Sequence, residues 1–199
     1  QSYTGLFTSG VGNNQASTQM TLNGNFYLTQ GGNFSVLTLP TFLSNAAGIT
    51  ISTTNNNTAG GNISFGSVSD SSSTINGANA LTLLSGTNAA ISLYSDIGNL
   101  APAVVSLTAQ AHNLSFRNVR TSGAQNYTGL FTLGVGTNQA STQLILNGLY
   151  VTDNAGFTVT TAPVILGGAT TIDTTNLAGT NGAAINIGSL GDSFSTING

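Results

Sequence analysis

The chain has 199 residues, of which only 4% are charged, and it contains no lysine, glutamate, cysteine or tryptophan. An ordinary soluble domain has about 25% charged residues, and a net charge of −3 spread this thinly gives no basis for attraction to nucleic acid or to an anionic membrane. A hydrophobic content of 39% is too high for a disordered low-complexity tract, and no run of about 20 apolar residues is present to span a bilayer. Composition therefore predicts an ordered protein with a core and a neutral surface of hydroxyl and amide groups.

Short segments of the pattern apolar, small polar, apolar recur along the first part of the chain. In chain order they are Leu37-Thr-Leu39, Ile49-Thr-Ile51, Ile63-Ser-Phe65, Leu81-Thr-Leu83, Ile91-Ser-Leu93, Val105-Ser-Leu107 and Leu114-Ser-Phe116. A period of two places both apolar side chains on one side of a strand, and the good helix formers are almost absent. Gly- and Asn-rich turns lie between the segments, as at Asn45–Gly48 and Ala59–Asn62. We therefore predict strands that bury pairs such as Ile63 with Phe65.

The beginning of the chain is repeated later in the sequence. Tyr3–Gly24 returns as Tyr127–Gly148, 124 residues further on, with 18 of 22 residues identical, and Ser73–Gly77 returns as Ser195–Gly199 at a shift of 122. No Pro-rich or charged spacer separates the copies. The sequence therefore predicts one repeat unit at residues 1–124 and a second, partial unit at 125–199 that continues the first.

A sandwich or barrel closes once and would need a linker between copies, whereas a solenoid continues through the joint. We therefore predict an all-β chain folded as a parallel β-helix, or β-solenoid, of tandem repeats. A coil of roughly 20 residues would give about six coils per repeat, and we expect Tyr3–Gly24 to superpose coil for coil on Tyr127–Gly148.

The joint between the copies carries a family resemblance. Leu114–Gly129, with its core Thr-Ser-Gly-Ala-Gln-x-Tyr-x-Gly, resembles the repeats of giant secreted bacterial adhesins of the filamentous-haemagglutinin type. The resemblance implies a right-handed β-helical shaft that is carried on a cell surface or released from it.

Few residues offer reactive chemistry. His112 is the only histidine, and because a metal site needs several nitrogen or sulfur ligands, we interpret it as a turn or surface residue. Arg117 and Arg120 flank Asn118 and Val119. A clamp for carbohydrate or carboxylate is one interpretation, and solvated turn arginines are the favoured one.

The carboxylates are isolated from one another along the sequence: Asp70, Asp96, Asp153, Asp173 and Asp192. Asp70 and Asp192 are equivalent residues of the two copies, too far apart for an acid-base pair. Turn capping explains all five. We also give no weight to the Asn-x-Ser/Thr sequons, because so Asn- and Thr-rich a chain contains them by composition; they begin at Asn33, Asn56, Asn62, Asn113 and Asn126.

We accordingly expect no enzyme activity and no catalytic, cofactor-binding or metal-binding residues. The favoured hypothesis is the structural shaft of an extracellular bacterial adhesin or surface filament. Its expected partners are further repeats of the same chain, neighbouring fibres and the glycans of other cells. The alternatives are an ice- or polysaccharide-binding face built from Thr and Asn rows, for which only Thr158-Val-Thr160 fits well, and a β-helical polysaccharide-degrading enzyme.

Overall fold

The computed structural model describes residues 2–4, 19–55, 59–68, 73–130, 142–177, 179, 181–188 and 197–198. Every regular element in these ranges is a β-strand, and all pairings but one hairpin and one bridge are parallel. The described part of the chain contains no helix long and apolar enough to cross a bilayer. The prediction of an all-β, parallel architecture is therefore confirmed.

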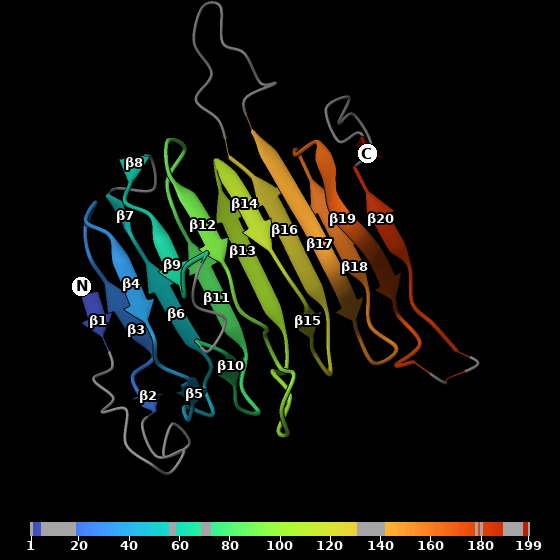
Figure 1. Ribbon diagram of the computed structural model, residues 1–199, viewed down its shortest axis with the longest axis horizontal. Helices are drawn as coiled ribbons and strands as arrows, with labels where there is room; N and C mark the ends of the chain where they lie inside the picture. Colours follow the sequence, from blue (N-terminus) through green and yellow to red (C-terminus); the bar gives the residue numbers. More distant parts are fainter. Residues whose placement is uncertain are drawn as a thin grey trace, which may run out of the picture.

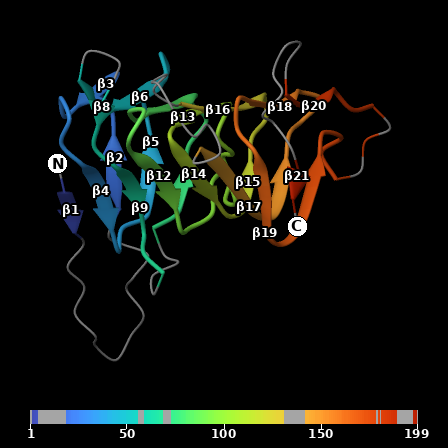
Figure 2. The same ribbon diagram turned by 90° about the horizontal axis from the view of Figure 1, so that it is seen from above.

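The strands form three faces around one core (Figures 1 and 2). The front face runs in the order β1 (Ser2–Thr4), β4 (Phe34–Leu37), β9 (Ile63–Phe65), β12 (Ala90–Leu93), β14 (Asn113–Phe116), the first parts of β17 (Gln143–Val151) and β19 (Val164–Asp173), and β21 (Ile197–Asn198). The back face runs in the order β3 (Phe26–Leu28), β6 (Ile49–Ser52), β11 (Leu81–Leu84), β13 (Leu107–Ala111), β16 (Gln125–Gly129), β18 (Phe157–Thr160) and β20 (Ile185–Ile187).

The lower face is made of shorter strands along the bottom of Figure 1. It consists of β2 (Met20–Leu22), β5 (Thr41–Leu43), β10 (Ile75–Asn76), a single bridge at Ile97, β15 (Val119–Arg120) and the second parts of β17 and β19. Strands β17 and β19 each bend from the front face to the lower face, with a register shift between Leu146 and Gly148 of β17.

The chain visits the front, lower and back faces in that order, and one such passage is called a circuit below. Strands β4, β5 and β6 make one circuit, and each of them pairs in parallel with its counterpart in the next. Paired residues of neighbouring front strands lie between 20 positions apart, for Leu144 and Val164, and 33 apart, for Ser2 and Ser35. A coil of roughly 20 residues is therefore the shortest spacing observed, because insertions at the corners lengthen most circuits.

Columns of apolar side chains fill the space between the faces. The predicted inward residues Ile63 and Leu83 are fully buried, which confirms their direction. The column that begins with Phe34 continues through Ile63, Ile91, Leu114, Leu144 and Val164, each at most 1% exposed. Burying one such side chain contributes about 1.5–3 kcal/mol. Five of the seven predicted segments form strands for this reason.

The other two predicted segments lie at corners. Thr38 has a φ of 60°, so the chain turns within Leu37-Thr-Leu39, and β4 ends at Leu37. Val105 is 39% exposed, and the strand begins only at Leu107. Alternation over three residues is too short to distinguish a strand from a corner that happens to carry two apolar residues.

Glycine allows neighbouring circuits to approach closely at one corner. The hairpin of β7 (Thr54–Asn55) and β8 (Ala59–Gly60) projects between the back and front faces. A Cβ atom on Gly86 would lie 2.2 Å from the backbone nitrogen of Gly60. Any side chain at Gly86 would therefore separate the two circuits.

The two copies of the repeat occupy different faces. Tyr3 pairs on the front face, whereas its equivalent Tyr127 pairs on the back face. Ile63 and Ile185 show the same displacement from front to back, and Ile75 and Ile197 from lower to front. One repeat therefore takes four circuits plus two further faces. The expected superposition of Tyr3–Gly24 on Tyr127–Gly148 falls mostly outside the described residues and stays a prediction.

Candidate functional site

A row of small polar side chains points outward from the back face. It is called the hydroxyl row here and consists of Thr50, Thr82, Thr108, Asn126 and Thr158, which are paired with one another in register on five consecutive strands. All five side chains are half-buried, and none makes a hydrogen bond to another part of the described chain. Because neighbouring parallel strands lie about 4.8 Å apart, the row presents free donors and acceptors at a regular interval.

A comparable row on the front face changes character along the molecule. The serine row consists of Ser35, Ser64, Ser92 and Ser115, and the next two positions are Ile145 and Ile165. Ser64 donates to the Ser35 hydroxyl at 2.8 Å, so part of this row is satisfied within the protein. The front face therefore offers no uninterrupted polar array.

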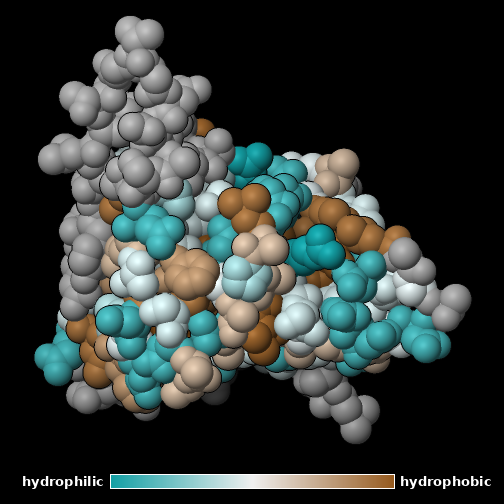
Figure 3. Space-filling model, turned by 90° about the horizontal axis from the view of Figure 1, so that it is seen from below, coloured by the Kyte–Doolittle hydropathy of each residue, from teal (hydrophilic) through white to brown (hydrophobic). Residues whose placement is uncertain are grey.

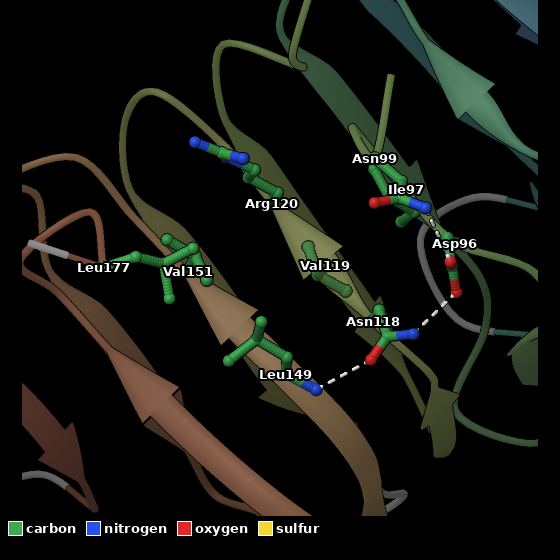
Figure 4. A pocket seen from close by; sticks show the side chains of 9 residues that line it. All are labelled: Asp96, Ile97, Asn99, Asn118, Val119, Arg120, Leu149, Val151 and Leu177. Carbon is green, nitrogen blue, oxygen red and sulfur yellow. Dashed lines mark hydrogen bonds between the residues drawn. The ribbon is translucent and has the colours of Figure 1, made fainter. Parts of the chain in front are cut away.

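The lower face carries a shallow hollow of about 270 Å³ (Figure 4). Asn118 spans its floor, because its amide donates to Asp96 Oδ1 at 2.9 Å and its carbonyl oxygen accepts from the Leu149 backbone N–H at 2.8 Å. Asn99 donates to the other carboxylate oxygen of Asp96 at 3.1 Å. Three successive circuits are thereby tied together by one asparagine.

Gly148 is required beside this asparagine. Its φ is +126°, and a Cβ atom there would lie 2.3 Å from Asn118 Oδ1.

The surface around the hollow is of mixed character. Figure 3 shows the lower side of the molecule, where hydrophilic and hydrophobic residues are intermixed rather than gathered into one patch. The hollow is therefore a part of the lower face that is held together by hydrogen bonds, and its lining includes one carboxylate, that of Asp96.

The two arginines do not form a clamp. Arg120 lines the hollow, and its guanidinium donates to Asn176 Oδ1 at 3.1 Å, whereas Arg117 donates to the Tyr94 carbonyl oxygen at 3.0 Å. In Figure 4 the Arg120 side chain extends away from Asp96. Both arginines are exposed and bind neutral groups, as expected for solvated turn residues.

His112 occupies the corner between β13 and β14. Its Nδ1 lies 3.1 Å from the Leu130 carbonyl oxygen and 3.3 Å from the Thr142 hydroxyl. The interpretation as a turn residue is confirmed by this position. Within the described ranges, no group of three or more His, Asp or Glu side chains comes together.

The remaining acids are dispersed. Asp173 caps a turn, because its Oδ1 accepts from the Thr175 backbone N–H at 2.7 Å and the Thr175 hydroxyl at 2.6 Å, and these bonds lower the pKa of the carboxyl. Asp153 is exposed. Asp70 and Asp192 lie outside the described residues. Turn capping is thus confirmed for Asp173.

The sequon asparagines have structural surroundings of different kinds. Asn33 Oδ1 accepts from the Asn62 backbone N–H at 2.8 Å, and Asn62 Oδ1 accepts in turn from Ala90 at 2.9 Å. Asn126 belongs to the hydroxyl row, Asn113 begins β14, and Asn56 lies outside the described residues. Two of these amides therefore form a ladder between circuits.

A buried polar pair in the core was not predicted from the sequence. Gln125 is fully buried; its amide donates to the Val151 carbonyl at 2.8 Å, and its oxygen accepts from the Tyr127 hydroxyl at 3.0 Å. Burial, followed by the nearby Tyr150, raises the pKa of Tyr127 well above its ordinary value. A Gln-x-Tyr pattern at the start of a predicted strand was the only available signal, since both residues share one side of that strand.

The sequence matches no family model, no curated protein and no solved structure. The function must therefore be argued from this chain alone.

Proposed function

We propose that this chain is part of the structural shaft of an extracellular bacterial adhesin or surface filament, wound as a right-handed parallel β-solenoid of tandem repeats. The supporting observation is that winding continues through the joint between the copies: β15 and β16 stand on either side of it, four residues apart, and both pair with neighbouring circuits. A crossover between parallel strands of one sheet is almost always right-handed. Tandem repetition makes the molecule longer, because each added circuit extends it by about 4.8 Å.

The surface supports the same function. Outward rows of Ser, Thr and Asn keep the walls wettable without charge, so attraction between the shaft and its surroundings changes little with salt. The partners proposed are further repeats, neighbouring fibres and the glycans or cells that such a filament would meet. No reaction is proposed, since the described acids lie singly at corners.

The test is the length of particles with increasing numbers of repeats. One repeat occupies four circuits and two further faces, so electron microscopy or small-angle scattering should show an increment of about 22 Å per added repeat at constant width. Particles that become wider rather than longer would overturn the shaft. Protease treatment of intact cells of the source organism should remove the protein if it lies outside the cell, and full protection would overturn that location.

The hydroxyl row favours a second candidate, the binding of ice or of an ordered polysaccharide. In-register Thr side chains on Thr50, Thr82 and Thr108 extend the array beyond the single motif at Thr158-Val-Thr160. The neighbouring outward row, however, contains Leu84 between Ser52 and Gln110, which interrupts a two-dimensional lattice. Thermal hysteresis or retention on insoluble polysaccharide that is lost in Thr82→Tyr but kept in the front-face variant Ser92→Tyr would establish it; absence of both activities would exclude it.

A further inference from the structure

The C-terminal end of the stack exposes the ends of the core columns. Ile197 and Leu166 end the two inward columns of the front face and are 57% and 39% exposed, and Ile185 ends a column of the back face and is 48% exposed. Their counterparts one circuit earlier, Val164, Leu146 and Phe157, are at most 1% exposed. These three side chains could pack against an apolar surface that has the same column spacing.

The repeat itself supplies strands with that spacing. In the first copy, β11 pairs with β6, with Thr82 beside Thr50. The equivalent of β6 in the second copy is the end of β19, because Ile51-Ser-Thr-Thr-Asn55 corresponds to Ile172-Asp-Thr-Thr-Asn176. This part of β19 pairs with β17, and no other strand of the described chain pairs with its outer edge.

We propose that this end is the docking surface for a further copy of the same repeat, and that each copy enters turned by one face relative to the copy before it. The proposal rests on the shaft function and specifies how its repeats join. A copy of β11 would lie on the lower face over Thr170–Asp173, and not on the back face over Ile185–Ile187. A copy of β12 would then cover Ile185, as β12 covers its equivalent Ile63 in the first copy.

The rotation already accounts for the change within the serine row. Ile145 and Ile165 on the front face are the equivalents of Thr21 and Phe42, which lie on the lower face of the first copy. The front row therefore changes from serine to isoleucine because residues of the lower face have moved there. Three successive repeats would take fourteen circuits, a whole number, so every face would regain its composition after about 67 Å.

In the experiment, a second copy of residues 78–124 is joined after Gly199. Pairs of cysteines are then introduced, one in the natural chain and one in the added segment, to report which strands become neighbours. The natural chain has no cysteine, and paired residues of neighbouring strands lie within the Cα separation that a disulfide accepts. The proposal expects Thr171→Cys to form a disulfide with the appended copy of Thr82→Cys. Without rotation, the appended Thr82→Cys would lie over the back face and form its disulfide with Asn186→Cys instead.

Hydrogen exchange distinguishes two negative results: that the added copy is not turned by one face, and that the chain does not form a shaft at all. Backbone amides of Thr170–Asp173 and Ile185–Ile187 should become protected at least about tenfold in the extended chain. An appended segment carrying Leu81→Asp and Leu83→Asp is the matched control, and it should give no protection. Protection with a disulfide to Asn186→Cys would overturn the rotation and leave the shaft standing, whereas no protection in the unmodified extended chain would overturn both.

A pair within the natural chain tests the rotation independently. Asn126→Cys should form a disulfide with Thr108→Cys, its neighbour on the back face. In an arrangement without rotation, Asn126 would occupy the front face as its equivalent Ser2 does, and Asn126→Cys would join Ser115→Cys. Formation of the second disulfide would overturn the proposal.

Discussion

The two copies of the repeat use the same residues in different surroundings. Phe34 and Phe157 are equivalent; Phe34 packs against Tyr27 and Phe65 with ring centroids 6.2 and 5.9 Å away, whereas Phe157 lies 5.3 Å from Tyr127 and 5.9 Å from Tyr150. One is on the front face and the other on the back. The same sequence segment can therefore form a strand on any of the three faces, because each face requires only apolar side chains pointing inward and small neutral side chains pointing outward.

The turn Leu-Asn-Gly shows how far this tolerance extends. In the first copy the Tyr27 hydroxyl accepts from the Asn23 backbone N–H at 3.1 Å, and in the second the Tyr150 hydroxyl accepts from the equivalent Asn147 at 3.1 Å. Tyr150 is the equivalent of Tyr27, because Tyr27 pairs with Ile51 and Tyr150 pairs with the equivalent Ile172. The second copy has one residue fewer between the turn glycine and this tyrosine, yet the same turn is braced in both copies.

The largest difference in stability between the copies is expected when the equivalent residues Ile63 and Ile185 are each replaced by aspartate. Ile63→Asp would bury an unpaired carboxylate in the core and should lower the free energy of unfolding by several kcal/mol. Ile185→Asp, in the second copy, should cost about 1 kcal/mol or less because Ile185 is half exposed. Chemical denaturation measures both; equal losses would mean that the two positions are not as differently buried as described.

A smaller difference in the free energy of unfolding is expected when Tyr27 and Tyr150, which accept hydrogen bonds from the turn, are each replaced by phenylalanine. Tyr150→Phe removes a bond from the hydroxyl to the Phe116 carbonyl at 2.8 Å in a fully buried site, and should cost about 1–3 kcal/mol. Tyr27→Phe should cost under about 1 kcal/mol, since water can replace its hydroxyl at a half-buried position. A larger loss in Tyr27→Phe would show that the first copy is the more tightly braced.

Alkaline pH should act mainly on the second copy. Burial raises the pKa of Tyr150 and of Tyr127 in the folded chain. Stability is therefore fully present below the unfolded value of about 10 and falls above it, by up to about 1.4 kcal/mol per pH unit for each tyrosine. Melting curves of Tyr150→Phe should fall less steeply above pH 10 than those of the parent, and identical slopes would contradict this assignment.

The smallest difference concerns Asp173 and its equivalent Ser52, which begin the same turn. The Ser52 hydroxyl lies 3.0 Å from the Thr54 hydroxyl, much as Asp173 binds Thr175. The lowered pKa of Asp173 gives stability that is present above about pH 4 and lost as pH falls below it. Asp173→Ser should thus melt slightly lower than the parent at pH 7 and no lower at pH 2; a deficit that persists at pH 2 would mean that charge is not the cause.

Period-two alternation was sufficient to predict strands such as Ile63–Phe65 and the all-β class, because burial on one side of a strand leaves a direct trace in the sequence. The rotation between copies could not be predicted in that way. It depends on corner insertions that lengthen circuits unequally, and corners have no periodicity. Gln125 was missed for a related reason, since its inward position depends on hydrogen bonds to the Val151 carbonyl on another strand and to the Tyr127 hydroxyl on its own strand.

The direction of the hydrogen bonds between circuits has a mechanical consequence. They join each circuit to the next along the axis of stacking, so a force that pulls the two ends apart acts first on a single terminal circuit. Release of that circuit frees 20 to 33 residues of chain, which extend to roughly 70–110 Å in place of about 4.8 Å. A stack of circuits joined in this way would lengthen stepwise under load and absorb work at each step.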